Sequence, residues 1–157
     1  PENDGWKVAK RLLEFERTMM ADMESEGAVD IEPLEVLRST QALNRPGSKT
    51  LHRKICKHEM RNNLIEMTMT RTAIESQNGF AHSALTLKYL STEETQKRWE
   101  LNVASLGMGG LEIVDRSDGL KKEVSKSFFY SKAYTIAGGS SEIQLNIISK
   151  NILGLTS

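Results

Sequence analysis

The sequence lacks the features that mark disulfide-rich, nucleic-acid-binding and membrane-spanning proteins. Its only cysteine, Cys56, cannot form an internal disulfide. The 21 basic side chains balance the 21 acidic ones, so the formal net charge is zero, and no run of like charge offers a surface to nucleic acid or to a charged membrane. There is no secretory segment and no apolar run long enough to cross a bilayer. We therefore expect a cytoplasmic location, with no nucleic acid and no membrane as partners.

Several catalytic and metal-binding signatures are missing as well. His52, His58 and His82 do not have metal-ligand spacing relative to one another or to Cys56, so we predict no metal site. The sequence contains no Ser-His-Asp set, no phosphate-binding loop and no dinucleotide fingerprint. It also contains no internal repeat and no low-complexity segment.

Apolar residues at helical spacing run through almost the whole chain, and no strand pattern of useful length interrupts them. Asp4 is expected as the N-cap of the first helix, Pro33 fits the first turn of the second, and Gly154 suits a C-terminal cap with positive φ. The expected helices cover residues 5–24, 31–44, 50–78, 81–106, 120–134 and 141–153. We predict one domain over residues 1–157, an all-α, antiparallel, four-helix-bundle-like fold with a short extra helix.

The same spacing predicts which side chains face the core. In the first helix, one apolar stripe is formed by Ala9, Leu12, Leu13, Met19, Met20 and Met23. In the later helices the expected core positions are Leu34, Leu37, Ala42, Ile55, Met60, Leu64, Met67, Ile74, Ala84, Leu85, Leu87, Leu90, Trp99, Val103, Leu106, Val124, Phe128, Phe129, Ile143, Ile147, Ile148 and Ile152. Residues 92–94 are interpreted as a kink or a solvated stretch, and residues 107–110 and 111–119 as loops.

Glu16 is a carboxylate that falls on the apolar stripe of the first expected helix. Glu14 instead shares the charged face with Lys7 and Lys10. Burial raises the pKa of a carboxyl group by about 1 to 3 units when no cation compensates, and a raised pKa suits a general base. Glu16 is therefore a candidate base. From the spacing alone, an edge residue that reaches water or pairs with a buried arginine is the more common case.

A glycine turn, Gly138-Gly139-Ser140-Ser141, opens the last expected helix. The unpaired backbone N–H groups of a helix start can bind an anion or a carbonyl oxygen, and glycine lets a ligand come close to the backbone. The alternative is that Ser140 caps the helix and the glycines only make a turn.

Two segments of the sequence resemble the acyl-CoA dehydrogenase family. Residues 138–155, GGSSEIQLNIISKNILGL, closely resemble its C-terminal motif, in which a Gly-Thr/Ser-Ser-Glu-Ile-Gln turn starts the last helix. Residues 5–9, GWKVA, together with Phe15-Glu16-Arg17, resemble the start of the family's C-terminal helical domain. The two matches lie at the right separation and cover essentially the whole chain. The chain is thus expected to be that domain, cut from a longer protein, as the opening Pro1 in place of Met also suggests.

The resemblance implies oxidation of an acyl-CoA thioester to the trans-2-enoyl-CoA with FAD as cofactor. In the family, a glutamate removes the α-proton while the flavin accepts a β-hydride. In many members this base directly precedes the Gly-Thr of the tail motif, a position that Gly138 holds here. A subgroup carries the base on the first helix, before an arginine, and this position is held here by Glu16, which Arg17 follows.

The resemblance also implies ligand contacts. Arg17 would help to hold the CoA part of the substrate, and the N–H of Gly138 or Gly139 would polarise the thioester carbonyl. The residues that would lie along the flavin are Ser140, Ser141, Glu142 and Gln144. The implied partners are acyl-CoA, an electron-transfer flavoprotein and further subunits of a homo- or hetero-oligomer, either a dimer or a tetramer.

The sequence departs from the family in the segment that contacts the FAD of a neighbouring subunit. An Arg-x-x-Phe-Gly loop and a Phe-Gln pair are replaced by Asn-Arg-Pro-Gly-Ser at residues 44–48 and by Lys57-His58, where Arg45 alone can stand in for the arginine. A hetero-oligomer in which only some subunits hold flavin would explain this. A non-catalytic partner subunit, an acyl-CoA oxidase and a helical interaction module without a ligand remain alternatives, and the isolated 157 residues are expected to be inactive.

Overall fold

The computed structural model describes residues 4–13, 15, 31–39, 47–79, 82–111 and 119–155. Residues 5–13 are helical, directly after Asp4, and the later elements are α2 (Pro33–Ser39), α3 (Ser48–Gln77), α4 (Ala84–Leu106), the 3-10 helix η2 (Gly107–Leu111), α5 (Gly119–Tyr134) and α6 (Ser141–Asn151). These described residues contain no strand, and the all-α prediction is confirmed.

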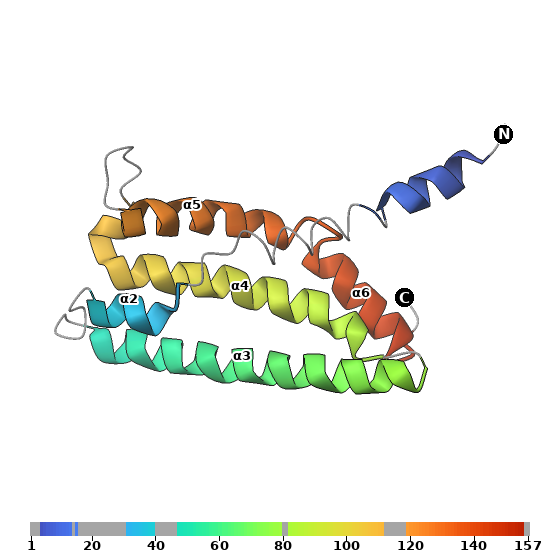
Figure 1. Cartoon of the computed structure of the whole chain (residues 1–157), viewed down its shortest axis with the longest axis horizontal. Helices are drawn as coiled ribbons and strands as arrows, with labels where there is room; N and C mark the ends of the chain where they lie inside the picture. Colours follow the sequence, from blue (N-terminus) through green and yellow to red (C-terminus); the bar gives the residue numbers. More distant parts are fainter. Residues whose placement is uncertain are drawn as a thin grey trace.

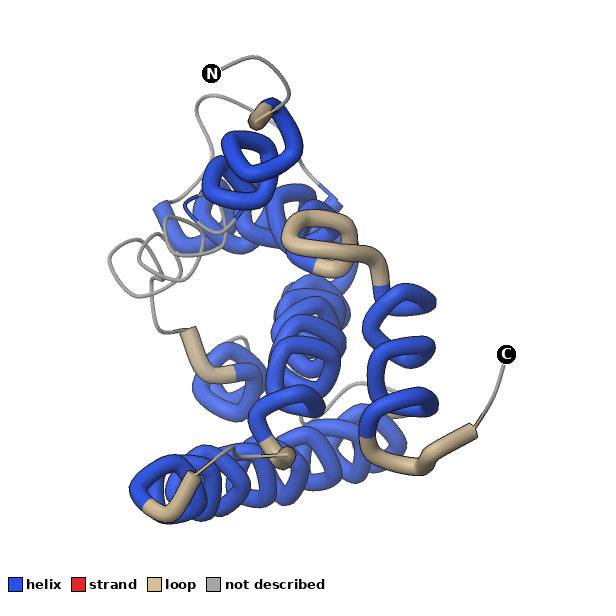
Figure 2. Tube along the Cα trace, turned by 90° about the vertical axis from the view of Figure 1, so that its right-hand side faces the viewer, coloured by secondary structure: helices blue, strands red, loops and turns tan. Residues whose placement is uncertain are grey.

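Helix α4 is the centre of the bundle. Helices α3, α4 and α5 lie side by side with alternating direction, and the short α2 packs against the end of α4 where α5 begins (Figure 1). Helix α6 turns away from the end of α5 at an angle and packs on α4 near its first turns (Figures 1 and 2). The start of α6 is therefore placed against the first half of α4.

Two apolar clusters form the described core, and α4 contributes to both. Trp99 and Leu106 pack with Val124 of α5, whereas Leu101 packs with Ile55 of α3. The short α2 supplies one residue to each cluster, Val36 to the first and Leu37 to the second. Burial of one such side chain contributes about 1.5–3 kcal/mol, so these few residues fix the arrangement of four helices.

Helix α3 turns a largely polar face toward the bundle. His58 is buried there, and the residues that follow it at helical spacing are half-buried, namely Asn62, Ile65, Thr68 and Thr72. Four of the expected core positions of this helix are exposed on another side: Met60, Leu64, Met67 and Ile74. The prediction for these four was wrong, because hydrogen-bonded polar side chains occupy the contact with α4 in place of the apolar stripe.

Other apolar faces are also left uncovered within the described residues. The expected core residue Leu12 is 67% exposed. The same correction applies to Leu13, Ala84, Leu90, Phe129, Ile143 and Ile152, all of which are exposed. Helix α6 accordingly buries a polar residue, Gln144, while Ile147 and Ile148 are half-buried.

Two segments interpreted as irregular are regular. Helix α4 runs unbroken through residues 92–94, where Thr92 and Glu94 are buried and only Glu93 is exposed, so the stretch as a whole is not solvated. Residues 107–111 form the 3-10 helix η2 in place of a loop. A Cβ on Gly110 would lie 2.6 Å from the carbonyl oxygen of Val103, so only glycine fits where η2 folds back on α4.

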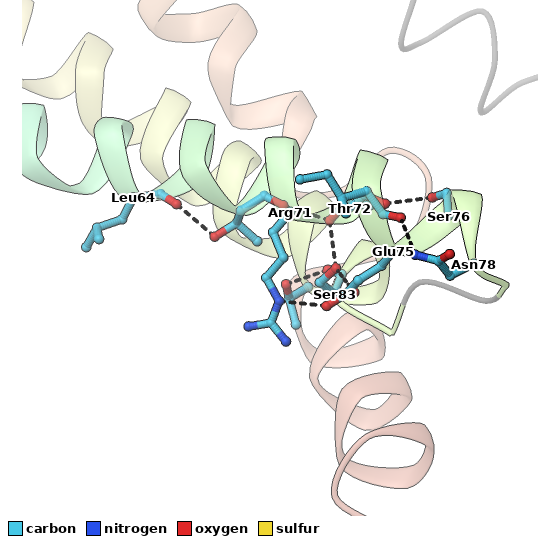
Figure 3. Close-up of polar contacts among 10 residues, drawn as sticks. Leu64, Arg71, Thr72, Glu75, Ser76, Asn78 and Ser83 are labelled. Carbon is cyan, nitrogen blue, oxygen red and sulfur yellow. Dashed lines mark hydrogen bonds and ion pairs between the residues drawn. The ribbon is translucent and has the colours of Figure 1, made fainter.

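The connection from α3 to α4 is held by a small polar network (Figure 3). The hydroxyl oxygens of Thr72 and Ser83 lie 2.7 Å apart, and Ser83 donates to Glu75, which also accepts from Arg71. The hydrogen bond from Ser83 and then that from Arg71 hold the pKa of the Glu75 carboxyl below its ordinary value.

A helix that spans a membrane must meet a requirement of both length and hydropathy. None of the described helices combines sufficient length with a sufficiently apolar sequence to span a bilayer.

Candidate functional site

The structure describes one half of the predicted site. The proposed base Glu16, its neighbour Arg17 and the proposed flavin contact Arg45 lie outside the described residues. The glycine turn and the start of α6 are described in full. The geometry of the carbonyl-binding side of the predicted site can therefore be built from its residues.

The glycine turn connects α5 to α6 and needs both of its glycines. Gly138 has φ 66 and Gly139 has φ 106, in the region that L side chains rarely adopt. A Cβ on Gly139 would also lie 2.9 Å from Nε2 of Gln144. Ser140 then turns extended, with φ −61 and ψ 162, and α6 begins at Ser141. The prediction that a glycine turn separates the last two helices is confirmed.

Gln144 fixes one peptide plane of this turn. The residue is only 8% exposed, and its Nε2 donates to the carbonyl oxygen of Gly138 at 3.1 Å. Because a trans peptide is planar, its N–H points opposite to its carbonyl, so this bond also sets the direction of the Gly139 N–H. The family resemblance implies that Gln144 lies along the flavin, and in this structure its amide nitrogen bonds the turn itself.

Lys88 of α4 also holds this turn. Its ammonium donates to the carbonyl oxygens of Tyr134 and Gly139, each at 3.0 Å. Tyr134 is the last residue of α5, whereas Gly139 lies in the turn. This lysine was not found from the sequence, because nothing in a local pattern links two residues that lie 51 positions apart.

The first turn of α6 carries its own carboxylate. The backbone N–H of Glu142 and then the hydroxyl of Ser140 hold the pKa of the Glu142 carboxyl below its ordinary value. Ser140 is the N-cap residue, but its hydroxyl makes no bond to a backbone N–H of the helix. Ser141 donates to Glu93 of α4, so two of the predicted flavin contacts bond to groups of this chain.

These contacts decide what the turn can bind. The N–H groups at the start of a helix have no intrahelical partner and attract oxygen ligands. An ionised Glu142 in the same turn repels a second anion but not a neutral oxygen. The arrangement therefore suits the oxygen of a carbonyl group better than a phosphate.

A second polar cluster lies between α3 and α4. His58 Nδ1 lies 2.7 Å from Glu94 Oε1, and Asn62 Nδ2 lies 3.1 Å from His58 Nε2. Arg61 lies 3.7 Å from the other oxygen of Glu94. Arg61 and Glu94 border a cavity of about 520 Å³ between the two helices. The sequence pattern missed this cluster because Glu94 was assigned to a kink or a solvated stretch.

Comparison with known proteins bears on the whole chain. The model of the family described as acyl-CoA dehydrogenase, C-terminal domain, matches residues 3–153. No solved structure matches the chain significantly.

Two curated relatives are both named acyl-CoA dehydrogenase IpdE1. The one from Mycobacterium tuberculosis is 28% identical over 165 residues, which cover 97% of this chain and 38% of the relative. The one from Mycolicibacterium smegmatis is 25% identical over 160 residues, which cover 97% of this chain and 37% of the relative. The chain thus spans less than two fifths of the length of these relatives. By the family match over residues 3–153, this chain belongs to the acyl-CoA dehydrogenases as their C-terminal domain.

Proposed function

We propose that this chain is the C-terminal domain of an FAD-dependent enzyme that converts an acyl-CoA thioester to the trans-2-enoyl-CoA. The observation that carries the proposal is the glycine turn at the start of α6, where two carbonyl oxygens are bonded by side chains of the chain itself. Such bonds fix the directions of the neighbouring N–H groups, as a site for a carbonyl oxygen requires. The family membership supplies the reaction class.

The proposed roles of the residues follow from this geometry and from the resemblance. The Gly139 N–H donates to the thioester carbonyl, because Gln144 holds the oxygen of the same peptide. A polarised carbonyl makes the α-proton more acidic, and Glu16 removes that proton as general base. Arg17 holds part of the CoA. The roles proposed for Glu16 and Arg17 rest on the sequence alone.

The proposed cofactor is FAD, which supplies the acceptor for the β-hydride when it is bound. The turn offers backbone N–H groups and the glycines needed for close approach, and this donor set fits the oxygens of a flavin ring. The side chains of Ser140, Ser141 and Gln144 already bond within the chain. The Glu142 carboxylate likewise accepts from its own backbone N–H and from Ser140. We therefore expect backbone groups of the turn to face the flavin, with Arg45 as the remaining side-chain candidate.

The proposal extends to the surroundings of the domain. A dimer or tetramer, homo- or hetero-oligomeric, would cover apolar side chains that the described bundle leaves exposed, such as Met67, which is 68% exposed. The proposed electron acceptor is an electron-transfer flavoprotein. The proposed setting of the reaction is fatty acid metabolism in the cytoplasm. A non-catalytic subunit of a hetero-oligomeric dehydrogenase is the second candidate, favoured by Gly138 at the position where many members carry the base.

The experiment that tests the proposed function uses the full-length protein. Flavin absorbance is followed under anaerobic conditions while short, branched, long and sterol-derived acyl-CoAs are added. We expect bleaching of the flavin with one class of substrate and formation of the enoyl product. One flavin per subunit supports the enzyme, a lower ratio supports the partner subunit, and fast reoxidation by oxygen supports an oxidase. Absence of both flavin and turnover in the intact complex would contradict the proposal.

A further inference from the structure

Lys88 has no assigned role in the proposed reaction. It sits on α4, half-buried, and its Nζ donates to the carbonyl oxygens of Tyr134 and Gly139, both at 3.0 Å. One ammonium group thus bonds the end of α5 and the second glycine of the turn that follows. We propose that Lys88 is a positioning residue, which holds the glycine turn in the conformation that presents its N–H groups to a ligand. The identity of the ligand rests on the proposed function, whereas the contact by which Lys88 holds the turn does not.

The turn needs such a hold because of its composition. Glycine reaches both signs of φ at little cost, so two adjacent glycines make this segment free to adopt several conformations. In the structure both have positive φ, 66 at Gly138 and 106 at Gly139. A constraint from outside the segment is therefore required to keep one of these conformations populated.

The contacts of Lys88 supply that constraint. Hydrogen bonds from a charged donor are roughly twice as strong as neutral ones, and these two lie in a partly buried setting. The carbonyl of Tyr134 is at the negative end of α5, where a cation is favoured by the helix dipole. The aliphatic stem of Lys88 also runs beneath the turn, since a Cβ on Gly138 would lie 3.8 Å from its Cε.

Lys88 and Gln144 together define two successive peptide planes. Gln144 bonds the oxygen of Gly138 and so directs the Gly139 N–H, while Lys88 bonds the oxygen of Gly139 and so directs the Ser140 N–H. A rotation of either peptide would break one of these bonds. The turn is therefore held at two adjacent peptides by side chains from two different helices, α4 and α6.

The test compares full-length Lys88→Met with Lys88→Arg and with the control Lys126→Met, in which an exposed lysine of α5 is changed. Hydrogen exchange is measured at two N–H groups beside the turn, Ala137, bonded to Ala133, and Gln144, bonded to Ser140. In Lys88→Met we expect these two to exchange about 5-fold faster or more. Lys126→Met should match the wild type, and Lys88→Arg should lie close to it, because arginine can also donate to two carbonyls.

The kinetic readout separates positioning from a purely structural role. In Lys88→Met, kcat with acyl-CoA should fall about 10- to 100-fold while KM changes less than about 3-fold, because misplaced donors act mainly on the transition state. Lys88→Arg should recover most of kcat. If Lys88→Met does not fold, Lys88→Gln, which keeps one donor group, takes its place.

Two results would overturn the inference. Unchanged exchange at Ala137 and Gln144 in Lys88→Met would show that the lysine does not hold the turn. Faster exchange with an unchanged kcat would show that the hold has no part in catalysis. If the wild-type protein acts on no acyl-CoA, the proposed function fails, and the exchange rates alone still decide whether Lys88 fixes the turn.

Discussion

The imidazole Nδ1 of His58 lies 2.7 Å from the Oε1 atom of Glu94, and this contact joins α3 to α4 inside the bundle. Both residues are nearly excluded from water, with exposed fractions of 2% for His58 and 7% for Glu94. The second ring nitrogen faces the amide of Asn62, an arrangement that fits Nδ1 as the donor to Glu94. Beside the apolar contact of Ile55 with Leu101, this polar pair is a main link between the two helices.

Replacement of Glu94 by alanine should destabilise the protein. The change leaves the buried Nδ1 of His58 without its acceptor, and an unsatisfied buried polar group costs about 1–3 kcal/mol. Urea denaturation of the full-length protein, followed through its helical signal, measures the effect. Glu66→Ala makes the same change at an exposed position of α3. Equal stability losses in the two variants would show that the buried pair is not a main link.

Replacement of Glu16 by glutamine should strongly slow reduction of the flavin. Glutamine keeps the size of the side chain but cannot accept the α-proton, and loss of a general base slows a reaction by about 10²- to 10⁴-fold. Anaerobic stopped-flow absorbance of the full-length protein with acyl-CoA measures the rate. Glu14→Gln is the matched control, because the sequence places Glu14 on the charged face of the same helix. An undiminished rate in Glu16→Gln would remove Glu16 as the base.

Replacement of Gly139 by alanine should disturb the turn. The residue has φ 106, and the new Cβ would lie 2.9 Å from Nε2 of Gln144, which must then move away from Gly138. The strained backbone alone costs about 1–3 kcal/mol. Gly119→Ala is the control, because a Cβ there meets nothing within 4 Å at the start of α5. Thermal unfolding and kcat of both variants measure the difference, and equal behaviour would contradict the described geometry.

The carboxyl of Glu142 should make stability depend on pH in the acid range. Its folded pKa lies below the ordinary value of 4.5, so its contribution is fully present above that value and is lost as pH falls through the folded pKa. Ser140→Ala removes one of the donors and should raise the pKa of Glu142 toward its ordinary value. Carbon-13 NMR titration of the side-chain carboxyl measures the change. An identical titration in the variant would mean that Ser140 does not bond this carboxylate.

Local pattern was sufficient to predict helices but not the faces that they bury. The expected helix over residues 120–134 is α5 almost to the residue, because its ends coincide with polar and glycine-containing segments. In α3 the apolar stripe through Met67 predicted the wrong face. Periodicity reports that a helix has an apolar side, whereas the side that meets α4 depends on hydrogen bonds such as that between His58 and Glu94.

Only part of the candidate site could be predicted from the sequence. The position of the glycine turn follows from the sequence because only glycine tolerates positive φ without strain. The bonds that fix its conformation do not, since Lys88 reaches it from another helix and Gln144 was interpreted as a cofactor contact. Such bonds exist only once the helices have packed. The role of Glu16 stays a prediction.

The uncovered side of α3 has a practical consequence for handling the chain. Met60, Leu64 and Met67 are spaced by four and three residues along the helix, so their exposed side chains form a continuous hydrophobic strip. A strip of this kind favours contact with other hydrophobic surfaces. Purified alone, the 157 residues should bind a fluorescent dye such as ANS and should aggregate as their concentration rises. Charged substitutions along the strip should suppress both dye binding and aggregation.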